Sequence, residues 1–226
     1  MKLTRCLHGS VALATVAVVT WFIAQSGVSA QGQTVKLFNG KDLTGWKQFV
    51  APNATVEPKD IWSIKDGVIL CKGQVNGYLI TEQEYENYVF KVQWRWGESV
   101  TRSRNSGVFV HVTGPDKIWP KSIEAQLMSG RAGDFWLVDG FQLTVDPARR
   151  DPNQARHYFR MKDEVEKTLG EWNQYEITCK GNAVKLVING QVVNEATDAE
   201  LSKGKILLQS EGAEVHFRNV ELTPIK

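Results

Sequence analysis

The chain has 226 residues, of which 42% are hydrophobic and 23% charged, with 27 basic and 25 acidic side chains. This composition is typical of a globular protein, and it excludes a disordered, a collagen-like and a multi-span membrane chain. Because the charges nearly balance and no run of Lys or Arg occurs, we do not expect a nucleic acid as partner.

The first 30 residues have the pattern of an export signal. Lys2 and Arg5 precede an apolar run at 11–24, and small residues at 28–30 offer a cleavage site after Ala30. The alternative, a retained membrane anchor, is disfavoured because the run is shorter than the roughly 20 residues that span a bilayer. We therefore expect a single domain, residues 31–226, which contains 25 basic and 25 acidic side chains. We expect this domain to be periplasmic or secreted and not to insert stably into a membrane.

From Gln31 onward the apolar residues follow a period of two, and turn residues separate the runs, which predicts β-strands. Two hairpins are expected around Asp66-Gly67 and Asn189-Gly190, dipeptides that supply the positive φ of a tight turn. One short helix is expected at 81–87, and a long surface loop with a functional role at 146–169. The predicted strands are residues 61–65, 68–71, 88–96, 107–112, 122–128, 141–145, 172–179, 184–188, 191–193, 205–209 and 215–222.

So many strands cannot form one flat sheet, and they must curl or split into two packed layers. The sequence therefore predicts an all-β fold, a jelly-roll β-sandwich of two antiparallel sheets. Cys71 and Cys179 both lie in strand patterns. A disulfide between them and a pair of buried free thiols are equally expected.

Alternation places several polar side chains together on an outer face. In the strand 122–128 the apolar residues face inward, so Glu124 and Gln126 share the other face, about 6.7 Å apart along the strand. If the strand that precedes it is its neighbour, His111 at the end of that strand joins them, together with Arg95. For each of these residues alone, a functional role and a purely structural one are equally expected, the latter being a solvated position or a salt bridge such as Glu124 with Arg95.

A second polar cluster is expected near the C-terminus, where Gln209, Glu211 and Arg218 offer an amide, an acid and a base. Carboxylates and amides bind pairs of sugar hydroxyls, and Trp faces lie against sugar rings. Trp119 and Trp136 are flanked by loop residues and are the candidates for such a platform. Further contacts to a carbohydrate are expected from Asn105, Lys121 and Asp134.

Five ordered motifs carry a family resemblance. They are 37–46 (LFNGKDLTGW), 105–109 (NSGVF), 124–126 (EAQ), 170–173 (GEWN) and 217–219 (FRN). Over residues 37–225 the chain resembles the 3-keto-disaccharide hydrolase family. The resemblance implies a concanavalin A-like jelly roll with two curved sheets, a secreted or periplasmic bacterial protein, and cleavage of glycosides oxidised at the sugar C3.

The chain departs from the family pattern at three places. His111 stands where many relatives have an arginine, Glu211 where they have a histidine, and Ser129 and Gly130 where they have an aspartate. The resemblance therefore implies a rearranged set of acids and bases, with a substrate or an activity that can differ from those of the relatives.

An ordinary glycosidase uses two carboxylates, but Gln126 occupies the position where a partner of Glu124 would stand on that strand. Glu211 or Asp134 could supply the second carboxylate. A 3-keto sugar offers another route, because the ketone acidifies the C2 proton. A base can then remove this proton, the C1 substituent leaves, and water adds to the unsaturated sugar.

For this route we expect Glu124 or His111 as the base, with Glu211 as a further catalytic group. Arg95, Gln126 and Lys121 are expected to bind hydroxyls or the developing oxyanion. A divalent metal ion held by His111, Glu124 and Glu211 is the alternative means of polarising the ketone. No other cofactor is expected.

Two other functions remain open at this point. The same jelly roll serves lectins, so a non-catalytic carbohydrate-binding module is the main alternative. The third is an interaction domain whose loop at 146–169 docks a partner. A lectin needs the aromatic and amide groups but no base with a shifted pKa.

Overall fold

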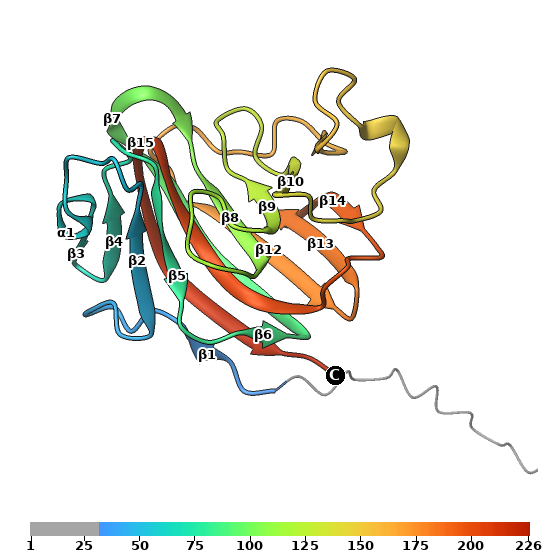
Figure 1. The fold of residues 1–226 in the computed structure, drawn as a ribbon, viewed down its shortest axis with the longest axis horizontal. Coiled ribbons are helices and arrows are strands. Elements are labelled where there is room, and N and C mark those ends of the chain that lie inside the picture. The colour runs from blue at the N-terminus through green and yellow to red at the C-terminus, as the bar shows by residue number, and fades with distance from the viewer. Residues whose placement is uncertain (1–31) are drawn as a thin grey trace, which may run out of the picture.

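The computed structural model describes residues 32–226, which form two antiparallel sheets joined by one long curved strand, β15 (Lys203–Pro224) (Figure 1). The predicted all-β jelly-roll sandwich is confirmed. The export signal predicted at 1–30 lies outside the described residues and stays a prediction. In the described part of the chain, no helix is long and apolar enough to cross a membrane.

The first sheet has the order β2–β5–β15–β8–β9–β10–β11 and is antiparallel throughout. Residues 205–210 of β15 belong to it. Its other strands are β2 (Trp46–Val50), β5 (Gly77–Thr81), β8 (Gly107–Val112), β9 (Ser122–Gln126), β10 (Phe135–Val138) and β11 (His157–Tyr158).

The second sheet has the order β3–β4–β15–β7–β12–β13–β14, with β1 paired to the end of β15. Its strands besides β15 are β1 (Val35–Lys36), β3 (Trp62–Lys65), β4 (Val68–Cys71), β7 (Tyr88–Asn105), β12 (Asn173–Lys180), β13 (Ala183–Ile188) and β14 (Gln191–Ala196). The short strand β6 (Tyr85–Glu86) pairs with the first residues of β15.

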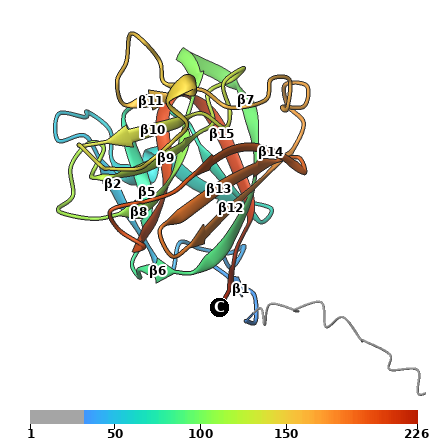
Figure 2. The same ribbon diagram turned by 90° about the vertical axis from the view of Figure 1, so that its right-hand side faces the viewer.

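The strand β15 (Lys203–Pro224) passes from the first sheet into the second, and its register against β7 shifts repeatedly between Glu211 and Val215. Such irregularities bend a strand. The turned view in Figure 2 separates the group β12–β14 from the group β8–β11. The bend places Glu211 at the junction of the two sheets.

Both predicted hairpins are confirmed, with positive φ at Asp66 and Gly67 and at Asn189 and Gly190. The inward residues of the strands form one core between the sheets, and Trp94 packs there against Tyr175 with 5.6 Å between ring centroids. Because one apolar face of each sheet is buried in this core, the other face of the first sheet is free to carry a site.

Two sequence-based expectations differ from the structure. Residues 81–87 form no helix, because Tyr85–Glu86 pairs with β15 instead, and the one α-helix among residues 32–226, α1 (Pro58–Ile61), is a single turn. Residues 141–145 alternate in burial but make only one bridge, at Thr144, because alternation reports burial and not pairing.

The loop at 146–169 is confirmed as largely irregular, with a 3-10 turn at Pro147–Arg149 and the two residues of β11. Cys71 and Cys179 are both free and buried.

Candidate functional site

We call the side of the first sheet that faces away from the core the front face. Phe109, Glu124 and Trp136 lie directly opposite one another on β8, β9 and β10. Residues directly opposite in antiparallel strands present their side chains on the same face. The predicted position of Glu124, on the face opposite to its apolar neighbours, is therefore confirmed.

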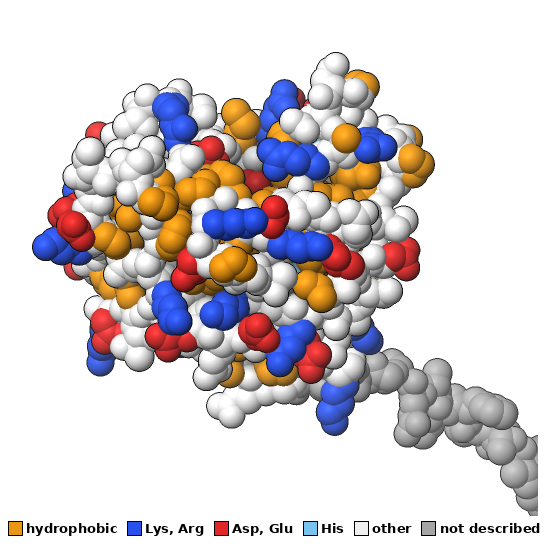
Figure 3. Space-filling model, in the orientation of Figure 1, with side chains coloured by type: hydrophobic (Ala, Val, Ile, Leu, Met, Phe, Trp, Pro, Cys, Tyr) orange, Lys and Arg blue, Asp and Glu red, His pale blue; other side chains and the backbone are white. Residues whose placement is uncertain are grey.

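Apolar side chains form the floor of one half of the front face. Trp119 lies over this floor, with its ring centroid 5.9 Å from that of Phe109. On the front face, Figure 3 shows hydrophobic side chains gathered in a hollow with basic side chains at its rim. The floor consists of Tyr78, Ile80, Phe109, Val112, Val138 and Leu207.

Glu124 is only 7% exposed, and its carboxyl group lies over a glycine. A Cβ atom on Gly107 would lie 2.7 Å from Oε1 and 2.9 Å from Cγ of Glu124, closer than side chains tolerate. Gly107 has no positive φ, so its backbone does not require a glycine. The missing side chain instead provides the space in which the Glu124 carboxyl group lies.

Glu211 reaches the same face from the bend in β15. Its Oε2 accepts a hydrogen bond of 2.9 Å from Nε2 of Gln209, and its backbone lies opposite Asn105. The Gln209 Oε1 and Asn105 Oδ1 atoms are buried and accept no hydrogen bond among the described residues. A buried acceptor without a donor is costly, so these two atoms are ready to receive hydroxyl groups.

The pKa values of both carboxyl groups are shifted, and Glu211 contributes to the shift of Glu124. Burial and the negative charge of Glu211 raise the pKa of Glu124 to about 8, against the lowering effect of Arg156. Burial also raises the pKa of Glu211, while Arg102 and Arg156 oppose this rise. Near neutral pH Glu124 therefore favours its protonated form, in which it can act as a general acid.

Trp136 forms an aromatic wall next to Glu124. The Arg156 guanidinium lies 4.8 Å from the centre of its ring, and His157 stacks on it at 4.2 Å with an angle of 12° between the planes. Both Arg156 and His157 belong to the loop that reaches β11. Of the two predicted sugar platforms, Trp136 lies directly across from Glu124 and Trp119 lies over Phe109.

Two predicted site residues make other contacts. Asp134 is fully buried, and its oxygens bind His157 at 2.8 Å and the Arg160 backbone at 2.9 Å, so it does not face the hollow. The Oε1 atom of Gln126 accepts hydrogen bonds from the next two backbone N–H groups, at 2.9 and 2.8 Å. Asp134 is therefore not placed to act as the second carboxylate. The Oε1 atom of Gln126 is not free to bind a sugar hydroxyl.

The prediction that His111 shares a face with Glu124 is wrong. His111 has φ +53°, and the pairing of β8 with β15 is irregular at this point, so the alternation reverses there. Val112 consequently joins the floor, while the His111 ring stacks on Phe141 of the main core at 6.4 Å. Burial lowers the pKa of His111 to about 4, so it is a neutral core residue and not the base.

Arg95 and Arg218 are also misplaced by the prediction, because they lie on the outer face of the second sheet. Their guanidinium groups lie over the ring of Trp172, at 4.8 and 4.1 Å, and Arg95 donates to His216. Lys121 forms an ion pair of 2.9 Å with Glu200. The prediction grouped Arg95 with Glu124, and Arg218 with Glu211, which assumed one polar face where the sandwich has two.

The metal site predicted from His111, Glu124 and Glu211 is not assembled, since His111 lies on the core side. In residues 32–226 no three His, Cys, Asp or Glu side chains come close enough to hold a metal ion.

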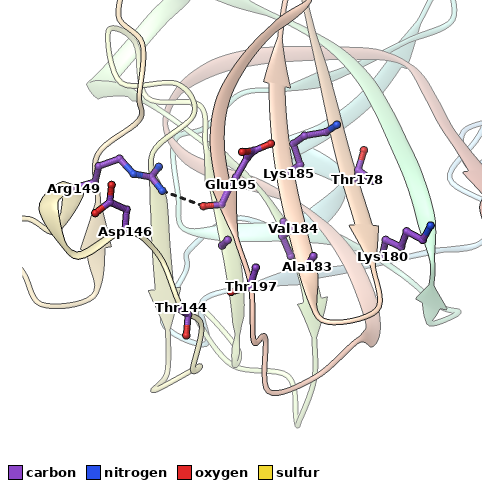
Figure 4. Close-up of a pocket in the computed structure, with 11 residues that line it drawn as sticks. Thr144, Asp146, Arg149, Thr178, Lys180, Ala183, Val184, Lys185, Glu195 and Thr197 are labelled. Carbon is purple, nitrogen blue, oxygen red and sulfur yellow. Dashed lines mark hydrogen bonds between the residues drawn. The ribbon is translucent and has the colours of Figure 1, made fainter.

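A surface pocket of about 520 Å³ lies elsewhere, along β12–β14 and the segment that follows Thr144. Figure 4 shows its side chains spread along the strands and not converging on one point. Lys180 and Lys185 stand in it with Asp146 and Glu195, so its charge is mixed. It contains no buried acid or base, and we do not assign a reaction to it.

Comparison with known proteins gives one family match. A family model described as 3-keto-alpha-glucoside-1,2-lyase-like domain matches residues 33–223. No curated protein matches the sequence.

Solved structures share the fold at low identity. A candidate glycosyl hydrolase from Parabacteroides distasonis is 24% identical, with a TM-score of 0.62 over 85% of this chain and 94% of that chain. The carbohydrate-binding module CBM66 from Bacillus subtilis is 10% identical, with a TM-score of 0.54 over 78% and 94%. The Bacillus licheniformis β-glucanase is 16% identical, with a TM-score of 0.50 over 89% and 100%. These likenesses establish the jelly-roll fold.

Sequence reasoning missed the arginines of the site. Arg156 lies in an irregular loop, and Arg102 lies in the last part of β7, so neither stands in a predicted strand. For the space around the Glu124 carboxyl group a usable signal was Gly107, the small first residue of an otherwise bulky strand.

Proposed function

Because the chain belongs to the 3-keto-alpha-glucoside-1,2-lyase-like family, a carbohydrate-active group of glycosyl-hydrolase-like fold, we propose that it cleaves 3-keto-glycosides by elimination across C1 and C2. The observation that carries this proposal is the pair of buried Glu124 and half-buried Glu211 on the front face, with the pKa of both carboxyl groups raised. A carbohydrate-binding module has no need of such a pair.

Glu211 acts as the base in this proposal, and Glu124 as the acid. The ionised Glu211 removes the C2 proton, which the C3 ketone acidifies, and the C1–O bond breaks as a C1=C2 double bond forms. Glu124, protonated near neutral pH, gives its proton to the departing oxygen. The Arg156 and Arg102 guanidinium groups provide positive charge for the enolate oxygen.

Substrate binding uses the other groups of the front face. Trp136 and the apolar floor offer surfaces for the apolar face of a sugar ring. The buried acceptor atoms of Gln209 and Asn105 accept hydrogen bonds from sugar hydroxyls. Both kinds of contact favour a sugar held between the floor and the loop that carries Arg156.

The test is a substrate comparison with the purified chain. A 3-keto-glucoside with a chromogenic aglycone should be cleaved, and the same glucoside without the C3 ketone should not, because its C2 proton is not acidic. A chelator should leave the rate unchanged. Equal cleavage of both compounds would contradict elimination, and saturable binding without cleavage of either would favour the carbohydrate-binding module.

Gly107→Ala tests the space that the Glu124 carboxyl group occupies. The added methyl group displaces Glu124, so we expect kcat/KM for the 3-keto-glucoside to fall about tenfold or more. In a Glu124→Gln background the same alanine should cause little further loss. If Gly107→Ala lowers kcat/KM equally in both backgrounds, the glycine does not act through Glu124. The thermal midpoint of each variant serves as control for folding.

A further inference from the structure

A fully buried histidine bridges two acidic side chains under the aromatic wall. His157 Nε2 lies 2.8 Å from Asp134 Oδ2, and its Nδ1 lies 2.8 Å from Asp151 Oδ2. Carboxylate oxygens accept hydrogen bonds, so two such contacts require that both ring nitrogens donate and that the ring be protonated. We call Asp134, His157 and Asp151 the histidine clamp.

The clamp adjoins the front face through one ring. His157 stacks on Trp136 with its plane nearly parallel to the indole. The opposite neighbour of Trp136 on β9 is Glu124, and the Arg156 guanidinium lies on the Trp136 ring. The charge of Arg156 in turn acts on Glu124 and Glu211. A continuous chain of contacts therefore links the clamp to the carboxyl pair.

The same loop is fixed at a second point. Arg149 hydrogen-bonds the Asn194 side chain and the Glu195 carbonyl of β14, the latter at 3.0 Å (Figure 4). Between the two anchors, which are Arg149 and the histidine clamp, the backbone N–H of Asp151 donates a hydrogen bond of 2.9 Å to the backbone carbonyl oxygen of His157. In Figure 1 this loop is the yellow segment beside β10 and β14. Because one anchor lies at each end, loss of the clamp frees the end that carries Arg156.

We propose that His157 is a positioning residue, which fixes the plane of Trp136 and thereby holds the Arg156 guanidinium beside the two site carboxyl groups. For its effect on turnover this proposal rests on the proposed function, in which Glu124 and Glu211 react with the substrate. Its effect on the charge around Glu124 does not depend on any reaction.

The clamp has a direction of pH dependence. Burial lowers the pKa of His157, but hydrogen bonds with Asp134 and Asp151 outweigh this and leave the pKa raised. The clamp is therefore complete below the ordinary histidine pKa of about 6.5 and loses one of its contacts as the pH rises through the raised value. The groups that face the ring or its partners are Asp134, Asp151, Trp136, Phe159, Arg160, Glu166 and Tyr175.

Three variants test the positioning role. Asp151→Asn removes one charge of the clamp, and His157→Gln removes the ring. Asp163→Asn is the matched control, since it removes a charge from the same loop at an exposed side chain that pairs with Arg160. The readouts are a carboxyl NMR titration of Glu124, the pH profile of kcat/KM for a 3-keto-glucoside, and the thermal midpoint.

With the clamp weakened, Arg156 moves from its place, so the pKa of Glu124 should rise further in Asp151→Asn and His157→Gln but not in Asp163→Asn. We expect kcat/KM at neutral pH to fall about tenfold. It should recover at lower pH in Asp151→Asn, where the ring regains its proton, and not in His157→Gln.

A lowered thermal midpoint with an unchanged Glu124 titration and an unchanged pH profile would overturn the positioning role. The NMR titration needs no substrate, so it decides this point even if the chain cleaves no 3-keto-glucoside. The failure of the proposed function is thereby kept apart from the failure of the proposal on His157.

Discussion

Glu124→Gln should lower kcat/KM for a 3-keto-glucoside by about 10²- to 10⁴-fold, the usual contribution of a general acid or base. The amide keeps the shape of the side chain over Gly107 but cannot give a proton to the leaving oxygen. KM should change little, because the apolar floor and Trp136 remain. Steady-state kinetics with an activated and a poor leaving group measure this, and the loss should be larger for the poor one.

The matched control is Glu176→Gln, which changes a carboxylate that pairs with Lys91 on the outer face of the second sheet. It should turn over like the wild type. Glu211→Gln should also lower kcat/KM strongly, but by the same factor for good and poor leaving groups, since it removes the base. A Glu124→Gln variant that retains the wild-type rate would remove Glu124 from the chemistry.

The second large effect is on stability. An unfolded glutamate has a pKa of about 4.3, whereas burial raises the pKa of Glu124 in the folded state to about 8. Between these values the folded state holds a proton that the unfolded state releases, so the free energy of unfolding falls as the pH rises. The full difference amounts to about 3 to 5 kcal/mol, and it is reached near pH 8.

Glu124→Gln removes this dependence, because the amide carries no proton to lose. Chemical denaturation at pH 5 and pH 8 should show the variant more stable than the wild type at pH 8 by about 2 kcal/mol or more, and nearly equal at pH 5. Glu176→Gln should follow the wild type at both values. A wild type that is as stable at pH 8 as at pH 5 would show that Glu124 ionises normally.

Strand alternation and turn chemistry were enough to predict the sandwich. The Asp66-Gly67 and Asn189-Gly190 hairpins depend on the preference of the two turn residues for a positive φ. This preference can be recognised from the dipeptide alone. The pairing of residues 135–138 was not predicted, because a four-residue run carries too little pattern, and the strand exists through its partners on both sides. Long-range pairing, not local preference, decides such strands.

The candidate site was predicted only where alternation holds. Glu124 stands in a regular strand, so its face followed from its neighbours, and Glu211 was recognised as a candidate acid. His111 was misplaced because its own positive φ reverses the alternation of the strand. No glycine or other typical turn residue at this position indicates that φ. Arg156 could not be predicted, since an irregular loop brings it to Trp136.

The most direct test follows the C2 hydrogen of a 3-keto-glucoside that carries deuterium at this position. Elimination with Glu211 as base and Glu124 as acid predicts that the deuterium is lost to water as the aglycone is released, with a slower rate for the deuterated compound. Release of the aglycone with the deuterium fully retained at C2 would contradict the proposed chemistry and indicate direct hydrolysis of the glycosidic bond.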